Sequence, residues 1–460
     1  MNALDVSIVI TWIAFTTALG MWAGIRSNLD EFWVNKRSTQ MLLLISTIVA
    51  TQVGGGTVIG ISSSAFSSGT GFGLVALIST VSGFLCVAFL APWAKRFGDR
   101  NQAYTLSEML RRRYGRSVQL AAAILMLVAY LALLGGQFLS AAVLIQVWSG
   151  WQAETTILVS AILMIVYSAF AGLRGDIITD AVHLCAKSVA LFLIVLPAIW
   201  LREPLINDLL NADAAIWSPL TFGGYSYLIA GIALGAIIPV VSMEMWMRVY
   251  AASNEITARR AFIWSAVGVI PFYVLPLCLG IAATQFSFQP SRPDTLLVEL
   301  IFAYLPHGLL GIAVAGLLAV VVSCANTMVV VLGAILYRDI LDRQAGADCR
   351  KEIRISRLLT LGVGLAGFGL AVLVGSIVQL ILSAFFIIGM IGPVLIGVSI
   401  WRRATKTGAF WALISGGIVT IGLLPVMPQQ AFLPGLAIGT LLFFGLSLLT
   451  SHSESENLTM

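Results

Sequence analysis

Apolar runs of about 20 residues recur along nearly the whole chain, and a helix of that length is what crosses a bilayer. Of the 460 residues, 59% are hydrophobic and only 10% are charged, whereas soluble domains carry about 25% charged residues. We therefore predict an all-α, multi-pass membrane protein with about thirteen transmembrane helices. The expected spans are 4–24, 41–66, 72–94, 117–147, 154–172, 178–201, 223–246, 260–284, 307–337, 356–374, 376–400, 408–426 and 430–449.

The basic residues indicate how the chain lies in the membrane. With the N-terminus outside, the cytoplasmic loops and their flanks carry 23 of the 26 Lys and Arg residues, and the other side carries only Arg202 and Arg292. This asymmetry follows the positive-inside rule and predicts an outside N-terminus and a cytoplasmic C-terminus in the inner membrane. It also accounts for the formal net charge of +5, so no nucleic-acid partner is expected.

The span at 41–66 contains three consecutive glycines, Gly54, Gly55 and Gly56, with polar residues on either side. Each glycine costs a helix interior about 1 kcal/mol relative to alanine, so a simple membrane anchor gains nothing from three. An interrupted helix exposes backbone groups, which membranes tolerate only where the segment is buried or lines a cavity. We expect a binding function here; close helix packing is the alternative for small residues.

A second interrupted span, at 223–246, contains Pro239 and Ser242, and an interior proline removes a backbone hydrogen bond. The interrupted spans are the second and the seventh, which indicates an inverted repeat of two five-helix halves with a site near the bilayer midplane. We expect one polytopic transporter domain over 1–460. Its parts are 1–40 (extra N-terminal helix and loop), 41–200 (first repeat), 223–400 (second repeat), 408–450 (two extra C-terminal helices) and 451–460 (polar tail).

Five stretches, in order along the chain, resemble segments of the sodium:solute symporter family. They are ATQVGGGTVIG (50–60), AGLRGDIITDAVH (171–183), MEMWMRVYAASNEITARRAF (243–262), AVVVSCANTMVVVLGAILYRDI (319–340) and GPVLIGVSIWRRATKTGAFWALISGG (392–417). The resemblance implies the five-plus-five inverted-repeat fold with extra flanking helices. It also implies a secondary active transporter that moves a small organic solute together with sodium by alternating access. It implies no enzyme activity and no organic cofactor, and the coupling ion is sodium or a proton.

The resemblance further implies a sodium site formed by carbonyls of the broken helix and by oxygens of the eighth core helix. By position, the candidate ligands are Ala50, Val53, Val320 and Ser323. A hard monovalent cation prefers such oxygen ligands, although a buried serine also commonly bonds to its own helix. Where the family usually has a second hydroxyl this chain has Cys324, and sulfur is a soft ligand.

Lys187 is unusual because it lies inside an expected span, and a lysine there is a functional candidate. Asp180 matches the family's aspartate near the sodium exit path, and Lys187 follows it at i+7 on the same helix face. Seven residues span about 10 Å of helix, which brings Lys187 to the depth of the sodium site. Three interpretations stay open: sodium coupling, an ammonium in the cation's place with proton-coupled or sodium-independent transport, and a lysine that only packs the bundle.

The solute pocket is expected beside the ion site. Its candidate residues are Gln52, Gly54, Gly55, Gly56, Thr57, Ser79 and Ser242. The glycines let a ligand approach the backbone closely, and the half-helix that follows them presents its N-terminus to an anionic group. This set favours a small solute such as a carboxylate or an amino acid. Glu244 and Arg248, spaced i,i+4, are interpreted as a structural or gating pair.

Two other classes of protein compete with a transporter. A membrane sensor could keep this fold and lose transport, but sensors of this kind carry cytoplasmic signalling domains and the tail at 451–460 is short. A membrane-embedded enzyme would need clustered acids or histidines at a membrane face, and the sequence offers no such cluster.

Overall fold

The structure, a computed structural model, describes residues 1–25, 34–200, 213–284, 289–342, 349–399, 401 and 403–456. Within these ranges the secondary structure is helical and contains no strand. The helices are α1 (Ala3–Ile25), η1 (Asn35–Arg37), α3 (Met41–Gln52), η2 (Gly56–Gly60), α4 (Ile61–Ser68), α5 (Gly71–Asn101), α6 (Leu106–Tyr114), α7 (Arg116–Ser149), α8 (Ala153–Trp200), η3 (Ala214–Trp217), α10 (Gly224–Val241), α11 (Met243–Ala251), α12 (Glu255–Gly268), α13 (Ile270–Ala283), η4 (Pro293–Thr295), α14 (Leu296–Tyr304), α15 (Leu309–Ala334), η5 (Ile335–Ile340), α16 (Cys349–Val374), α17 (Ile377–Gly389), α18 (Gly392–Ser399), α19 (Lys406–Leu423) and α20 (Phe432–Glu456).

The helices of the described ranges have the length and composition of membrane spans. Eight are long and apolar enough to cross a bilayer, and nine if one bent pair is counted as a single span. Shorter apolar helices lie at Ala153–Ile165, Gly224–Gly235 and Leu361–Val374. The all-helical membrane class predicted from the sequence is therefore confirmed. The thirteen crossings, the repeat and the orientation of the termini stay predictions.

The first helix break lies at the glycines, as the sequence predicted. Helix α3 ends at Gln52, and Val53 has an extended backbone with φ −89° and ψ 90°. The chain turns helical again from Gly56, first as the π-helix η2 and then as α4. The two parts of this span differ in direction by 54°. Carbonyls near Val53 are thereby released from the regular i→i+4 pattern.

The second break lies at Ser242, between α10 and α11. The backbone of Ser242 is extended, with φ −73° and ψ 122°, and Pro239 lies in the last turn of α10. A neighbouring helix passes very close to this proline, because a Cβ added at Gly83 of α5 would lie 2.2 Å from Pro239 Cγ. Both interruptions are thus packed inside the bundle, where membranes tolerate irregular backbone.

Residues 173–177, which separate two of the expected spans, do not form a loop. One helix of 48 residues, α8, covers both the 154–172 and the 178–201 spans and runs through these residues. One glycine, an arginine and an aspartate in this segment resemble a loop in composition, but contacts of α8 with α15 and α7 stabilise the helical backbone. Consequently Asp176, Asp180 and Lys187 all project from a single helix.

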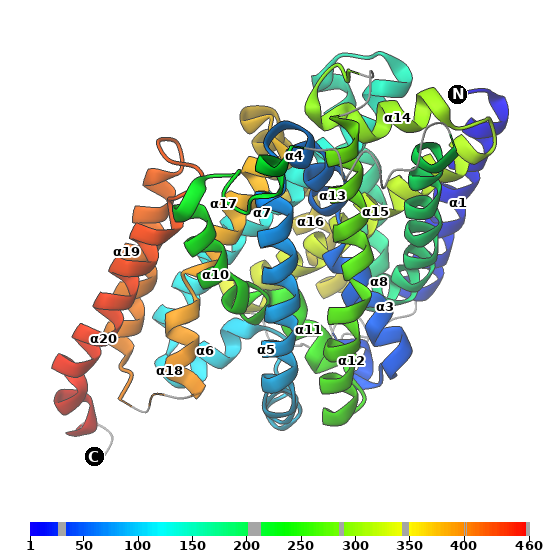
Figure 1. The fold of residues 1–460 in the computed structure, drawn as a ribbon. Helices are drawn as coiled ribbons and strands as arrows, with labels where there is room; N and C mark the ends of the chain where they lie inside the picture. Colours follow the sequence, from blue (N-terminus) through cyan, green and yellow to red (C-terminus); the bar gives the residue numbers. More distant parts are fainter. Residues whose placement is uncertain are drawn as a thin grey trace.

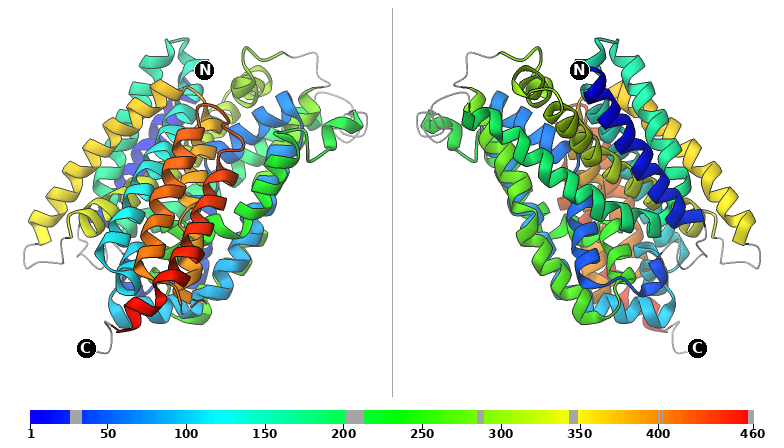
Figure 2. Two further views of the ribbon diagram at one scale, coloured as in Figure 1. Left: turned by 90° about the vertical axis from the view of Figure 1, so that its left-hand side faces the viewer. Right: turned by 90° about the vertical axis from the view of Figure 1, so that its right-hand side faces the viewer.

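The flanking helices lie on opposite sides of the bundle. Figure 1 shows α1 at one edge and the α19–α20 pair at the other, and both views of Figure 2 agree. Helix α1 begins and α20 ends at opposite ends of the bundle. The Asp5 carboxylate of α1 accepts the backbone N–H groups of Gly308 (2.7 Å) and Gly311 (3.1 Å). This contact caps the N-terminus of α15 and ties α1 to the core.

Candidate functional site

Three oxygens converge on the ammonium of Lys187 at the first helix break. Lys187 Nζ donates to the backbone oxygens of Ala50 (2.6 Å) and Val53 (2.9 Å) and to Ser323 Oγ (2.8 Å). Lys187 comes from α8, the carbonyls from the end of α3, and Ser323 from α15. An ammonium has three N–H donors, so these contacts satisfy all of them. The side chain is buried. Its positive charge is therefore stabilised by carbonyl dipoles at the end of a broken helix and by the Ser323 hydroxyl.

The remaining candidate ion ligands lie close by but make other contacts. Cys324 Sγ donates to the backbone oxygen of Thr51 at 3.0 Å and lies 3.5 Å from that of Ala50. Val320 is buried in α15, one turn before Ser323. Of the oxygens expected to bind sodium, those of Ala50, Val53 and Ser323 contact Lys187 among the described residues.

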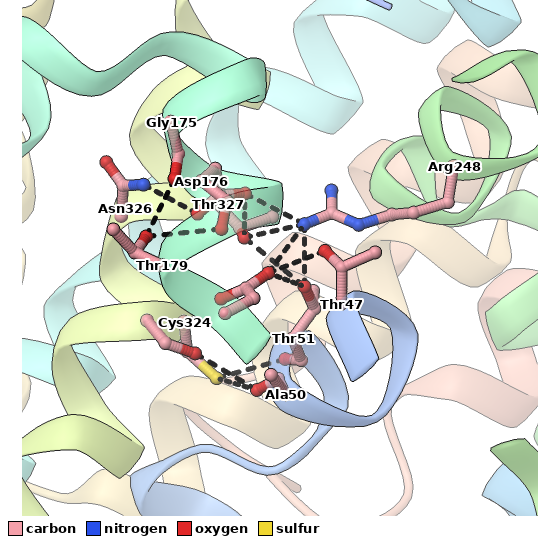
Figure 3. Close-up of polar contacts among 12 residues, drawn as sticks. Thr47, Ala50, Thr51, Gly175, Asp176, Thr179, Arg248, Cys324, Asn326 and Thr327 are labelled. Atoms are coloured by element: carbon pink, nitrogen blue, oxygen red, sulfur yellow. Dashed lines mark hydrogen bonds and ion pairs between the residues drawn. The ribbon is translucent and has the colours of Figure 1, made fainter. Parts of the chain in front are cut away.

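A second buried polar cluster surrounds the guanidinium of Arg248 (Figure 3). Asp180 belongs to this cluster. Arg248 Nη2 lies 2.8 Å from Asp176 Oδ2 and 3.5 Å from Asp180 Oδ2, and all three side chains are fully buried. It also donates to the hydroxyls of Thr51 (2.7 Å) and Thr327 (3.0 Å). The cluster thus joins α11 to α8, α3 and α15. The last three helices also form the Lys187 site.

Further neutral donors bind the two aspartates of this cluster. Thr47 donates to Asp180 Oδ2 at 2.6 Å. Thr327 and Asn326 donate to the two oxygens of Asp176 at 2.7 and 2.6 Å. Because buried carboxylates are costly unless they are paired and hydrogen-bonded, these contacts explain how both acids lie in the bundle interior.

A cavity of about 80 Å³ lies directly beside the Lys187 site. Polar groups from four helices and from the break of α3 line it together with apolar residues. The lining residues are Thr51, Gln52, Gly54, Gly56, Thr57, Ile61, Phe72, Ala76, Leu133, Gln137, Glu244, Tyr273, Cys324, Met328, Ile381 and Phe385. The cavity is mainly apolar with a few polar groups, as small-molecule sites are.

The candidate solute residues fall into two groups. Gln52, Gly54, Gly56 and Thr57 line the cavity, while Gly55 lies just behind it and donates its N–H to Gln137 Oε1 at 3.1 Å.

The other two candidates make contacts elsewhere. Ser79 packs against Gly235, because a Cβ added there would lie 3.2 Å from Ser79 Cα. Ser242 Oγ is buried and donates to the backbone oxygen of Ile238 at 2.8 Å. Neither residue is part of the cavity lining. Their role in solute binding stays a prediction that their described contacts do not favour.

Glu244 and Arg248 do not form the i,i+4 ion pair that their spacing suggested. Among the described residues Arg248 pairs with Asp176 and Asp180, while the Glu244 carboxylate accepts the hydroxyl proton of Tyr130 and lines the cavity. The interpretation as a local pair is therefore wrong. Glu244 lies two residues after the interruption at Ser242 and lines the cavity.

Several polar residues of the cavity were missed by the sequence analysis. Gln137 and Tyr273 lie in apolar helices far along the chain from the first break, and Tyr273 lies beside Gln52, whose Nε2 is 3.2 Å from the phenol oxygen. Thr80, next to the predicted Ser79, bonds with Tyr273 at 2.8 Å. Isolated polar residues in a span are the signal that such groups offer.

Gly55 provides a direct test of why the break needs glycine. A Cβ added at Gly55 would lie 2.0 Å from Ser140 Oγ and 2.2 Å from Ser140 Cβ. We expect Gly55→Ala to lower the free energy of unfolding by about 1–3 kcal/mol, because over-packing strains a filled interior. Thermal unfolding of the purified protein measures the effect.

Gly60→Ala is the matched control, since its added Cβ would lie no closer than 3.7 Å, to Val378 Cγ2. The double substitution Gly55→Ala with Ser140→Gly should recover most of the lost stability. If Gly55→Ala is as stable as Gly60→Ala, close packing against Ser140 is not the reason for this glycine.

Comparison with known proteins agrees with the fold. The model of the family described as "Sodium:solute symporter family" matches residues 32–416. The sodium/pantothenate symporter of Escherichia coli (strain K12) is 24% identical over 453 residues, covering 90% of this chain and 91% of that protein. The sodium/proline symporter of Staphylococcus aureus is 21% identical over 415 residues, covering 86% and 80%.

A solved structure has the same fold. It is the substrate-bound outward-open state of a Na⁺-coupled sialic acid symporter, with a TM-score of 0.84 and 14% identity over 97% of this chain and 98% of that chain. The relatives are named as symporters, so they are membrane transporters and not enzymes. With most of its length matched by the family model, this chain belongs to the sodium:solute symporter family.

Proposed function

We propose that the chain is a secondary active transporter that moves a small organic solute by alternating access. The solute would bind in the cavity beside the first helix break, lined there by Gln52, Gly54, Gly56 and Thr57. Family membership supports transport, and broken helices that border a common site are a recurring feature of secondary transporters. Cys324 supports a link between solute and ion, because it lines the cavity and contacts the carbonyls of the break.

Two coupling modes compete at the Lys187 site. Sodium-coupled symport is supported by the family and by the names of the relatives. Proton-coupled or sodium-independent transport, with Lys187 in the cation's place, is favoured by the three contacts of Lys187 Nζ at 2.6, 2.9 and 2.8 Å. The two cations would need the same oxygens and would repel each other. We propose the second mode, and the convergence of these oxygens on the ammonium is the observation that supports it.

The melting temperature of the purified protein in sodium and in potassium, at matched ionic strength, tests the proposal without a known solute. An ion that binds only the folded protein stabilises it, by roughly 2.7 kcal/mol at a hundredfold excess over Kd. We expect equal melting temperatures in the two salts over a broad concentration range. A saturable rise specific to sodium, lost in Ser323→Ala, would instead establish sodium coupling at this site.

A further inference from the structure

The cavity beside the first helix break is lined by an acidic side chain, that of Glu244. Glu244 lines the cavity at the start of α11 and is only 6% exposed. The hydrogen bond to its carboxylate comes from a neutral group: the Tyr130 hydroxyl donates to the carboxylate and also accepts the N–H of Met243 at 2.8 Å. Arg248, which lies more than 4.0 Å away, attracts the Glu244 carboxylate only at longer range. Among the described residues, no Lys or Arg lines the cavity. No side-chain nitrogen of a basic residue lies within 4.0 Å of the Glu244 carboxylate oxygens there, since Arg248 pairs with Asp176 and Asp180.

The charges around the cavity do not cancel. Asp176 and Asp180 share the guanidinium of Arg248, and Lys187 is the other cation of this region. With Glu244, the groups around the cavity are three buried carboxylates and two buried cations, so one negative charge is left when all five are ionised. An uncompensated charge inside a membrane protein is costly. A proton on one of the three carboxylates, or a cation in the cavity, compensates this charge, and Glu244 is the carboxylate of the three that lines the cavity.

The other polar groups of the cavity are neutral and suit a small polar molecule. Gln52, Gln137, Thr57 and Tyr273 offer amides and hydroxyls around a volume of about 80 Å³. Neutral donors and acceptors orient a ligand without adding charge. Glu244 is the one carboxylate among the described residues of the lining, so we expect it to set the preference of the cavity for charged or neutral solutes.

We propose that this cavity takes a small solute with a protonated amine, and that the Glu244 carboxylate binds its ammonium group. This inference rests on the proposed transport function and narrows its substrate class from carboxylates and amino acids in general to amines. A charged hydrogen bond made in a buried site accounts for a preference of about tenfold or more for an amine over the matching alcohol. A proton held permanently by Glu244 is the competing arrangement, and it predicts no such preference.

Matched pairs of small probes, each differing only in an amine or a hydroxyl, test the proposal. The pairs are ethanolamine and ethylene glycol, alaninamide and lactamide, and alanine and lactate. Their effect on the melting temperature of the wild-type protein gives the apparent affinities. We expect the amine of at least one pair to bind about tenfold or more tightly than its alcohol. Equal stabilisation by both members, stronger stabilisation by the alcohols, or no stabilisation by any probe contradicts the proposal.

Glu244→Gln keeps the size and an oxygen for the Tyr130 hydroxyl but removes the charge. In this variant the difference within each pair should disappear, while Glu154→Gln, which removes an exposed carboxylate, should keep it. A preference for amines that persists in Glu244→Gln would show that another group binds the ammonium.

A second measurement, the rate at which Cys324 is chemically modified, needs no probe that binds in the cavity. Cys324 lines the cavity, and its modification can be followed in a variant with serine at Cys86, Cys185, Cys278 and Cys349. The cationic reagent 2-aminoethyl methanethiosulfonate should react faster, relative to neutral methyl methanethiosulfonate, when Glu244 is present than in Glu244→Gln. An unchanged ratio of rates overturns the proposal.

Failure of the proposed transport function can be distinguished from failure of the proposed preference for amines. Binding of an amine without its uptake into proteoliposomes would leave the charge preference of the cavity intact and contradict the transport function. Uptake of an uncharged or anionic solute, unaffected by Glu244→Gln, would support transport and overturn the amine preference.

Discussion

Replacing Arg248 with methionine is expected to lower the free energy of unfolding by about 3–5 kcal/mol, the cost of breaking a buried ion pair. The change leaves Asp176 and Asp180 without their cation, and both carboxylates are fully buried. It also removes the donor that Thr51 and Thr327 share. Thermal unfolding in detergent, together with the yield of folded protein, measures the loss.

Arg96→Met is the matched control for Arg248→Met. Arg96 pairs with Glu255 at 3.1 Å, but both side chains are exposed, and an exposed pair contributes about 0–1 kcal/mol. The double substitution Arg248→Met with Asp176→Asn should be more stable than the sum of the two single effects, because residues in one network do not act additively. Similar losses in Arg248→Met and Arg96→Met would mean that the buried cluster is not an ion-pair network.

Lys187→Ala is expected to make the protein respond to sodium. The substitution removes the ammonium from the oxygens of Ala50, Val53 and Ser323 and leaves carbonyl and hydroxyl groups that suit a hard cation. We expect a melting temperature that rises in sodium and not in potassium, with a stabilisation of roughly 2.7 kcal/mol at a hundredfold excess over Kd. The wild-type protein should show no such difference.

Lys95→Ala controls for the loss of a buried lysine as such. Lys95 is also buried, and it donates to the Asp99 carboxylate at 2.8 Å and to the backbone oxygen of Tyr250 at 3.0 Å. Its replacement should lower stability equally in both salts. If Lys187→Ala gains no response to sodium, the oxygens around Lys187 do not form a cation site, and the lysine has only a packing role.

The features that sequence reasoning located best are those set by backbone chemistry. Consecutive glycines at 54–56 and Pro239 before Ser242 mark the two breaks, because glycine and proline act on the helix wherever they occur. The depth of Lys187 followed from its i+7 spacing from Asp180 on one helix face, taken together with the position that the family resemblance implied for Asp180. Local rules of this kind need no knowledge of distant partners.

Features that depend on distant partners could not be predicted in the same way. The i,i+4 spacing suggested that Glu244 pairs with Arg248, but buried acids on α8, 68 and 72 residues away, bind the arginine instead. A buried arginine is stabilised more by two buried carboxylates than by one local i,i+4 partner. The sequence does not show that the two acids of α8 lie next to Arg248. The continuity of α8 through 173–177 is similarly a result of packing, which overrides the low helix propensity of glycine.

Helix α8 is the shared partner of both broken spans. Lys187 bonds with the end of α3, while Asp176 and Asp180 bond with Arg248 of α11, just beyond the second break. A displacement of this segment of α8 would therefore release both spans in one concerted step, whereas neither could move away from it without breaking a charged contact. A substitution in α8 that weakens one contact should consequently raise the rate at which both sides of the site open, and the two motions should share one time constant.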